Sequence, residues 1–211
     1  MTLHTTSWTP PEQGALFVVA GASGTGKTTL VKEALDAIPG LQFSVSATTR
    51  PIRPGEKDGT DYWFLTRDAF TTRVENGDFL EWAEVYGNLY GTLRAPVQQT
   101  LGDGFSILLD IDTQGAEQVR QSGIAHTSVF VLPPDLATLS RRLSSRGTDE
   151  KAVIDRRLRE AHEQISAAGT FDCIVVNDDL DSAHDQFQAI IVAELLRTNR
   201  HSRLVGQFRA G

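Results

Sequence analysis

The sequence predicts an α/β fold in which a central parallel sheet of about five strands is covered by helices on both faces, as a three-layer sandwich. Three observations support this prediction. Short apolar runs alternate with amphipathic segments, a glycine-rich motif joins the first apolar run to the first amphipathic segment, and one aromatic-rich stretch interrupts the alternation. We therefore expect one main domain with a smaller lobe inserted into it.

The strands and helices of the core are predicted from the spacing of apolar residues. Short apolar runs with the composition of buried strands lie at 15–20, 105–110, 128–132 and 173–176. Residues 41–46 alternate between apolar and polar side chains, which indicates a strand nearer the sheet edge. Amphipathic segments predict helices at 27–38, 94–101, 114–121, 135–143, 150–167 and 182–196. Because strands alternate with helices, we expect the strands to be parallel.

One stretch breaks this alternation. Between Thr48 and Tyr90 the apolar residues are mainly aromatic and are separated by polar residues, which predicts a small mixed, mostly β lobe. We therefore divide the chain into a core at 15–47 and 93–197 and an inserted lobe at 48–92. The remaining residues, 1–14 and 198–211, are expected to be flexible tails.

Composition and charge exclude several classes of function. The chain has 211 residues and a formal net charge of −7, which argues against nucleic acid or an anionic membrane as its main partner. No apolar run reaches about 18 residues, so we expect no membrane span. The chain has a single cysteine, Cys173, so it forms no internal disulfide, and the apolar neighbours of Cys173 predict a buried side chain. The lack of disulfides leads us to expect a cytoplasmic protein. We expect a monomer or a weak homo-oligomer.

A phosphate-binding motif follows the first predicted strand. Residues 21–28 fit the pattern GxxxxGK[ST] without a gap, with a strand before them and a helix after them. The glycines allow consecutive main-chain N–H groups to point inward and form an anion nest at a helix N-terminus. Lys27 supplies positive charge to the β- and γ-phosphates, and Thr28 supplies a hydroxyl ligand for Mg²⁺. The predicted nucleotide-binding residues are Gly21, Ala22, Ser23, Gly24, Thr25, Gly26, Lys27 and Thr28.

This motif predicts a P-loop protein that binds a nucleoside triphosphate, but it does not determine the reaction. A GTPase would need an NKxD-type sequence that reads the base, and residues 177–180, Asn-Asp-Asp-Leu, lack the lysine. Asp110 and Asp112 follow a predicted strand, at the edge where open parallel sheets bind ligands. An acid there commonly helps to hold hydrated Mg²⁺, and we expect Asp110 to do so through water. Asp112 is explained equally well as the cap of the next helix.

A second anion site is predicted after the strand at 41–46. Arg50 and Arg53 lie three residues apart and are flanked by proline and glycine, a pattern that suits charge-assisted contacts to a phosphate. Tyr62 and Tyr90 add hydroxyl donors. For these residues taken alone, a solvated basic loop is the alternative explanation.

Several blocks of the sequence together resemble the guanylate kinase family in order and spacing. They lie at 45–62, 79–83, 87–92, 109–115 and 176–180, and the resemblance covers residues 15–197. It implies transfer of a phosphate from ATP to GMP, or to dGMP, with Mg²⁺. By this resemblance the GMP phosphate is held by Arg50, Arg53, Tyr62 and Tyr90, and the guanine is read by Ser46, Glu81, Thr92 and Asp112. Asp110 is also expected at the substrate.

The chemistry of guanine supports the role that the resemblance implies for Glu81. Guanine presents N1–H and an exocyclic amine side by side, and one carboxylate accepts from both. Adenine has a bare N1 acceptor at this edge and would leave the carboxylate unpaired, which discriminates by up to about 10⁴-fold. Ala22 and Thr28 depart from the proline and serine that are common in the family, and both preserve the chemistry.

The segment at 141–160 is the predicted lid over the phosphates. Residues 141–159 contain seven basic residues and three acidic ones, a local net charge of about +4 in an acidic chain. This charge suits stabilisation of a phosphoryl group in transfer. The resemblance implies that Arg142, Arg146 and Arg157 face the phosphates, whereas Arg141, Arg156 and Arg159 are assigned to a solvated helix surface. The predicted catalytic residues are Lys27, Arg50, Arg142, Arg146 and Arg157.

Two alternative functions stay open at this point. A non-catalytic guanylate kinase-like interaction module would share the fold, but such modules have typically lost the phosphate-binding loop that is intact here. A kinase for a related phosphorylated small molecule, such as a ribose bisphosphate, would be expected to lack the complete set of Arg50, Arg53, Tyr62 and Glu81.

Overall fold

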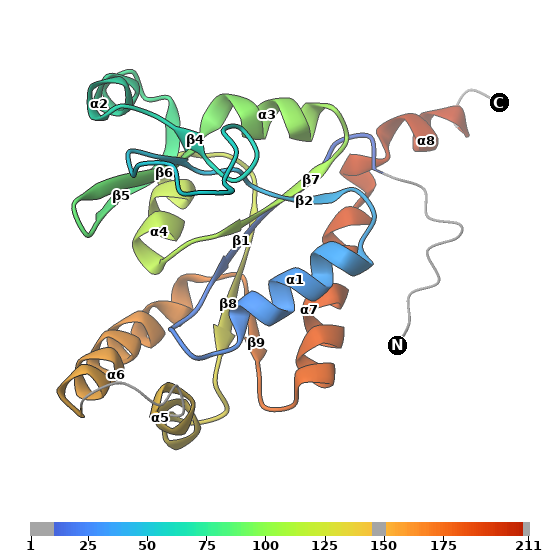
Figure 1. The fold of residues 1–211 in the computed structure, drawn as a ribbon. Helices are drawn as coiled ribbons and strands as arrows, with labels where there is room; N and C mark the ends of the chain where they lie inside the picture. Colours follow the sequence, from blue (N-terminus) through green and yellow to red (C-terminus); the bar gives the residue numbers. More distant parts are fainter. Residues whose placement is uncertain (1–10, 145–150, 209–211) are drawn as a thin grey trace.

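The central sheet consists of five parallel strands. The structure is a computed structural model that describes residues 11–144 and 151–208. The strands are β1 (Leu16–Ala20), β2 (Leu41–Phe43), β7 (Ser106–Asp110), β8 (Thr127–Leu132) and β9 (Cys173–Val176), in the order β2-β7-β1-β8-β9 (Figure 1). Later strands lie on both sides of β1, so the fold places a ligand-binding crevice at the carboxyl end of that strand.

Alternate residues of β1 pack against two different helical layers. The covering helices are α1 (Lys27–Ala37), α3 (Arg94–Gly102), α4 (Thr113–Gln121) and α7 (Leu180–Leu195). Phe17 packs in one core cluster with Leu30 of α1, whereas Val18 packs in another with Val119 of α4. Because side chains alternate along a strand, α1 and α7 cover one face of the sheet and α3 and α4 the other (Figure 1). The predicted three-layer α/β fold is confirmed.

Two further helices lie beside the phosphate-binding loop. They are α5 (Leu136–Ser144) and α6 (Lys151–Ser166). Leu139 and Leu143 of α5 form a small buried cluster with Ala161 of α6 and with Ala22 of the loop. The helices of the predicted lid are therefore packed directly onto the loop that they are expected to cover.

The inserted lobe is a second sheet with one helix. Its strands are β3 (Ala47–Thr48), β4 (Trp63–Phe64), β5 (Phe79–Val85) and β6 (Asn88–Leu93), in the order β4-β3-β6-β5. Only β3 and β4 run parallel, so the sheet is mixed, as predicted. Helix α2 (Arg67–Glu75) covers one face, where Phe70 stacks on Phe79 with 4.3 Å between ring centroids. Phe70 is the only buried residue of α2, so no amphipathic period marks this helix in the sequence.

The two edge strands of the core sheet differ in part from the strands predicted at 41–46 and 173–176. Strand β2 lies at one edge, as predicted, but it ends at Phe43, and the chain then turns toward β3 in the lobe. Strand β9 lies at the other edge, where Ile174 is 50% and Val176 is 43% exposed. The prediction of a buried strand at 173–176 is therefore wrong for one of its faces, because apolar composition does not reveal a missing neighbour. Cys173 is likewise only partly buried.

The C-terminal segment is ordered rather than a loose tail. A 3₁₀ helix (Thr198–Arg200) is followed by α8 (Ser202–Gln207). The Arg200 guanidinium donates to the carbonyl of Gly14 and to Glu194, both at 2.6 Å, and Glu12 accepts from the main chain of Arg203 at 2.7 Å. Residues 11–14 and 198–208, assigned to the predicted tails, therefore contact each other through a largely buried arginine. Residues 1–10 and 209–211 lie outside the described chain.

Candidate active site

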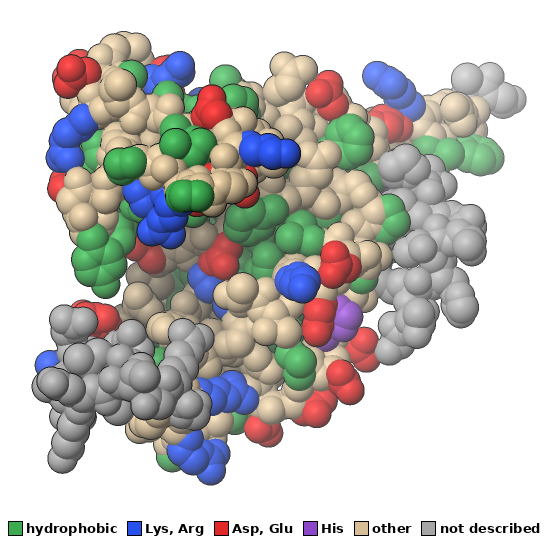
Figure 2. Space-filling view, viewed as in Figure 1, with side chains coloured by type: hydrophobic (Ala, Val, Ile, Leu, Met, Phe, Trp, Pro, Cys, Tyr) green, Lys and Arg blue, Asp and Glu red, His purple; other side chains and the backbone are tan. Residues whose placement is uncertain are grey.

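A pocket of about 700 Å³ opens at the carboxyl ends of β1 and β7. The molecular surface is hollowed between the lobe and the region of α5 and α6 (Figure 2). The pocket is lined by residues 21–29, Asp110, Ile111, Asp112, Arg142, Glu160, Ala161 and Gln164. All eight predicted nucleotide-binding residues are part of this lining.

The loop at 21–28 has the conformation that its glycines allow. Gly24 and Gly26 have φ values of 87° and 86°, in the left-handed region that side chains disfavour. Gly26 is also the N-cap of α1, and no side chain caps this helix. The first N–H groups of α1 therefore keep their capacity to donate to an anion at the pocket.

Lys27 and Asp110 meet inside this pocket. The Lys27 ammonium pairs with the Asp110 carboxylate, and both side chains are mostly shielded from solvent. They come together because β7 lies beside β1, with Val19 opposite Asp110. The structure thus joins the predicted phosphate-binding lysine to the predicted magnesium-associated acid.

Asn177 is a residue of this site that the sequence reasoning missed. It is 5% exposed, and its side-chain amide donates to the carbonyl of Thr25 at 2.8 Å. The main-chain carbonyl of Asn177 accepts from the Arg142 guanidinium at 3.0 Å. Asn177 therefore ties the end of β9 to the phosphate-binding loop and to α5. It falls within a family-like block, but no local pattern reveals a contact that spans 152 positions.

Three of the four predicted phosphate-binding residues of the lobe, Arg50, Tyr62 and Tyr90, form one cluster. Arg50 lies over the Tyr62 ring at 5.3 Å, and the rings of Tyr62 and Tyr90 are 6.2 Å apart. Glu56 accepts two hydrogen bonds from Arg50, at 2.7 and 3.1 Å, and a third from the main chain of Arg53 at 2.8 Å. These contacts raise the pKa of Arg50 and hold the pKa of Glu56 below its usual value. Glu56 was not predicted as a site residue, although it follows the two arginines closely.

Glu81 is a buried carboxylate on β5 of the lobe. It is 7% exposed and accepts from the Thr92 hydroxyl at 2.6 Å. Burial raises the pKa of Glu81, the nearby Asp112 carboxylate raises it further, and the Thr92 hydroxyl partly opposes both. Asp112 itself accepts from the main chain of Gly115 at 2.7 Å, so it caps α4. The capping explanation for Asp112 is thus correct, and the same acid lies close to Glu81.

The remaining predicted site residues are Ser46, Thr28, Arg53, Arg146 and Arg157. Ser46 lies just before β3, and its carbonyl accepts from the main chain of Trp63 at 2.9 Å. Thr28 is exposed within the pocket lining, and the Arg53 side chain is exposed on the lobe. Arg146 and the side chain of Arg157 lie outside the described residues.

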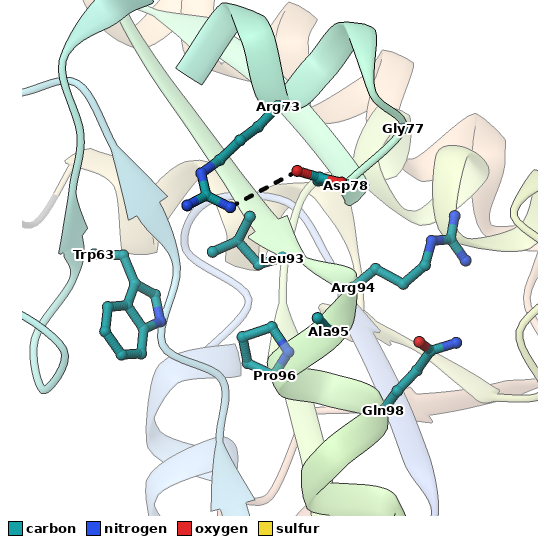
Figure 3. Close-up of a pocket in the computed structure, with 9 residues that line it drawn as sticks. All are labelled: Trp63, Arg73, Gly77, Asp78, Leu93, Arg94, Ala95, Pro96 and Gln98. Atoms are coloured by element: carbon teal, nitrogen blue, oxygen red, sulfur yellow. Dashed lines mark ion pairs between the residues drawn. The ribbon is translucent and has the colours of Figure 1, made fainter. Parts of the chain in front are cut away.

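A second pocket, of about 550 Å³, lies where the lobe meets α3 (Figure 3). It is lined by Trp63, Arg73, Gly77, Asp78, Leu93, Arg94, Ala95, Pro96 and Gln98, and Arg73 pairs with Asp78 at 3.7 Å. Leu93 follows Thr92 on β6, so the two side chains face opposite ways. This pocket therefore lies on the opposite face of β6 from Thr92, which donates to Glu81.

Comparisons with known proteins agree with this arrangement. The family model described as guanylate kinase matches residues 13–194. A guanylate kinase of Pseudomonas fluorescens is 46% identical over 93% of this chain and 96% of its own length. A guanylate kinase of Thiobacillus denitrificans is 47% identical over 95% of this chain and 99% of its own length.

A solved structure extends the similarity to three dimensions. The crystal structure of guanylate kinase from Anaplasma phagocytophilum has a TM-score of 0.68 and 33% sequence identity. It covers 90% of this chain, and the match spans 91% of that protein. The family match, the extent of the relatives and the shared fold together show that this chain belongs to the guanylate kinase family.

Proposed function

We propose that this chain transfers the γ-phosphate of ATP to GMP, and to dGMP, and releases ADP and the nucleoside diphosphate. The observation that carries this proposal is that a phosphate-binding loop and a buried carboxylate lie on either side of Asp112. Asp110 and Asp112 line the pocket of the loop, and Asp112 accepts from the main chain of Gly115, which lies against Glu81. We take the loop as the donor end and Glu81 as the acceptor end of one cleft.

The donor end suits a nucleoside triphosphate. Main-chain N–H groups of the loop and the N-terminus of α1 donate to the phosphates, and Lys27 neutralises their charge. Arg142 reaches the same pocket from α5. We assign Arg146 and Arg157 to the same task, because phosphoryl transfer depends mainly on positioning and on charge neutralisation.

Thr28 and Asp110 fit a magnesium ion. A hydroxyl and a carboxylate are the hard oxygen donors that this ion prefers, and both line the pocket beside the loop. When bound, the ion would neutralise the β- and γ-phosphates. Lys27 pairs with Asp110 in this structure, so we expect the lysine to exchange this partner for phosphate when ATP binds.

The lobe suits the acceptor phosphate. Arg50, Tyr62 and Tyr90 lie together, with Arg53 nearby in the same loop. The Glu56 carboxylate accepts from Arg50 with two oxygens, the geometry that a phosphate would also use. We propose that Glu56 holds Arg50 extended toward the cleft until the GMP phosphate arrives.

The buried end suits guanine. The Glu81 carboxylate is fixed by Thr92 and lies near Asp112, where guanine N1–H and its amine would donate to it. Ser46 is assigned to the same base. Burial makes the carboxylate costly to leave unpaired, so a base without these donors is rejected.

The decisive experiment is a coupled ADP-release assay with GMP, dGMP, AMP, CMP and UMP as acceptors. We expect GMP to have the highest kcat/KM, with dGMP next and the other three at least about 10²-fold lower. If AMP is used as well as GMP, the proposed acceptor is wrong.

Two wider expectations also stay proposals. None of the helices in the described part of the chain is long and apolar enough to cross a membrane. We propose a cytoplasmic enzyme that acts as a monomer or a weak homo-oligomer, which size measurements in solution would test.

A further inference from the structure

A side-chain amide of the core binds the main chain of the lobe beside Glu81. The Gln118 Oε1 atom of α4 accepts from the Trp82 N–H at 3.0 Å, and Gln118 Nε2 donates to the Trp82 carbonyl at 2.9 Å. Strand β5 is an edge strand, so its outer main-chain groups have no neighbouring strand there. The carboxamide of Gln118 therefore takes the place of a neighbouring strand at this single residue.

The two neighbours of Glu81 are both held by the core. On one side, Leu80 packs in the core cluster that contains Ala116 and Val119 of α4. On the other side, Trp82 is held through its main chain by Gln118. The position of Glu81 is thus set by contacts with the core, although Glu81 lies on a strand of the lobe.

Helix α4 also lies against the Glu81 carboxylate itself. A Cβ atom at Gly115 would lie 3.1 Å from Glu81 Oε2, so the helix main chain lies directly against this oxygen. Gly115 and Gln118 are three positions apart, which puts them on the same face of the helix. A loss of the Gln118 contacts would let β5 move away from α4, and the carboxylate would move with it.

We propose that Gln118 is a specificity-positioning residue, which fixes Trp82 and thereby holds Glu81 against α4 in the geometry that selects the base. The inference rests on the proposed base-reading role of Glu81. Discrimination needs a carboxylate that cannot relax toward water when the wrong base is bound, and a fixed main chain on both sides provides this restraint. The phosphate-binding residues Arg50 and Tyr62 lie outside this restraint, on the loop and β4 region of the lobe.

The test compares Gln118→Met, which keeps the length of the side chain and removes both hydrogen bonds, with Gln121→Met. Gln121 lies on the same helix and donates to Glu117 on the surface, so it is a matched control. We expect Gln118→Met to raise KM for GMP and to lower the GMP-to-AMP ratio of kcat/KM, each by about tenfold. KM for ATP should stay within about twofold, and Gln121→Met should change none of these values.

Two further variants separate the possible failures. Glu81→Gln tests the base-reading role directly, and the double variant tests whether Gln118 acts through Glu81. If it does, Gln118→Met should have little further effect on the ratio in the Glu81→Gln background. If Glu81→Gln lowers the ratio and Gln118→Met does not, this inference alone is overturned. If Glu81→Gln also leaves the ratio unchanged, the base-reading role is overturned as well.

Stability is measured on the same samples. Gln118→Glu, which keeps the acceptor for Trp82 N–H and loses the donor, serves as a second variant if Gln118→Met does not fold. A merely structural role would lower the melting temperature and the active fraction while the GMP-to-AMP ratio stays constant in each variant that folds. That result would overturn the proposal.

Discussion

The donor end and the acceptor end of the cleft are constructed in different ways. The donor end is built around one continuous segment, residues 21–28, whose main-chain N–H groups do much of the binding, with Asp110 and Arg142 beside it. The acceptor end is assembled from side chains on separate segments, with Arg50 in a loop, Glu81 on β5, Thr92 on β6 and Asp112 before α4. Binding of the triphosphate therefore depends mainly on local geometry, whereas binding of the acceptor depends on contacts between separate elements.

The largest effect is expected at Lys27, the main charge of the donor end. We expect Lys27→Ala to lower kcat by at least about 10³-fold for every acceptor, because positive charge at the transferred group is lost. Lys32→Ala, on the exposed side of α1, is the control and should stay within about twofold. Steady-state kinetics with GMP and dGMP measure both. A modest loss at Lys27 would contradict the assignment of the donor end.

The next largest effect is expected at Glu81, and it should depend on the acceptor. We expect Glu81→Gln to lower kcat/KM for GMP by about 10²-fold and to leave AMP unchanged or improved, because an amide presents a donor to the base. Glu84 lies on the same strand and is exposed, so Glu84→Gln is the control for the effect of the same substitution on β5 itself. Equal loss for all acceptors would show that Glu81 is a structural residue.

A smaller effect is expected at Asn177, a side chain from the end of β9 that contacts the phosphate-binding loop of the donor end. Its amide holds the Thr25 carbonyl, so Asn177→Ala should loosen the phosphate-binding loop. We expect KM for ATP to rise about tenfold, with KM for GMP within about threefold. Asn199→Ala, in the exposed 3₁₀ helix, is the control. An equal rise in both KM values would mean that Asn177 does not act through the loop.

Glu81 should also make stability depend on pH. Burial raises its pKa above the unfolded value of 4.5, so the folded chain binds more protons than the unfolded chain between those two pKa values. The free energy of unfolding therefore falls as pH rises through this window. Glu81→Gln should have a higher free energy of unfolding than the parent at about pH 8, and this difference should vanish near pH 4. Calorimetry at the two pH values checks the sign, and a difference independent of pH would refute the cause.

The smallest effect is expected at Arg141, which was assigned to the solvated surface of the predicted lid. Its guanidinium donates to Thr138 at 2.7 Å on the exposed side of α5, whereas Arg142 faces the pocket. We expect Arg141→Ala to change kcat by less than about twofold and Arg142→Ala to lower it by at least about tenfold. Similar losses in the two variants would show that general charge, not position, matters in this helix.

The fold was predictable where a local pattern carries the information. Strands β1, β7 and β8 are continuous apolar runs, and the helices that cover them have an apolar stripe, so periodicity located both. Helix α2 buries one side chain, and β9 lacks a neighbour on one side, so the same rules missed the first and misjudged the burial of the second. Neither fact has a signature in the residues themselves.

The sequence alone determined the donor end of the cleft. The glycines at 24 and 26 adopt left-handed conformations through their own lack of a Cβ atom, and Lys27 follows them directly. The motif therefore specifies most of its geometry within a few residues, and the contact from Asn177 to Thr25 adds support from a distant part of the chain.

Only the tertiary structure decided how the acceptor end is held. Gln118 of α4 binds the main chain at Trp82, and Gly115 of the same helix lies against Glu81. Both contacts depend on the packing of a helix against an edge strand, which no local spacing encodes. The donor loop has one long-range contact as well, from Asn177 to Thr25 across 152 positions. The physical reason is that a buried carboxylate or amide takes its function from the partners that burial brings to it, and those partners come from elsewhere in the chain.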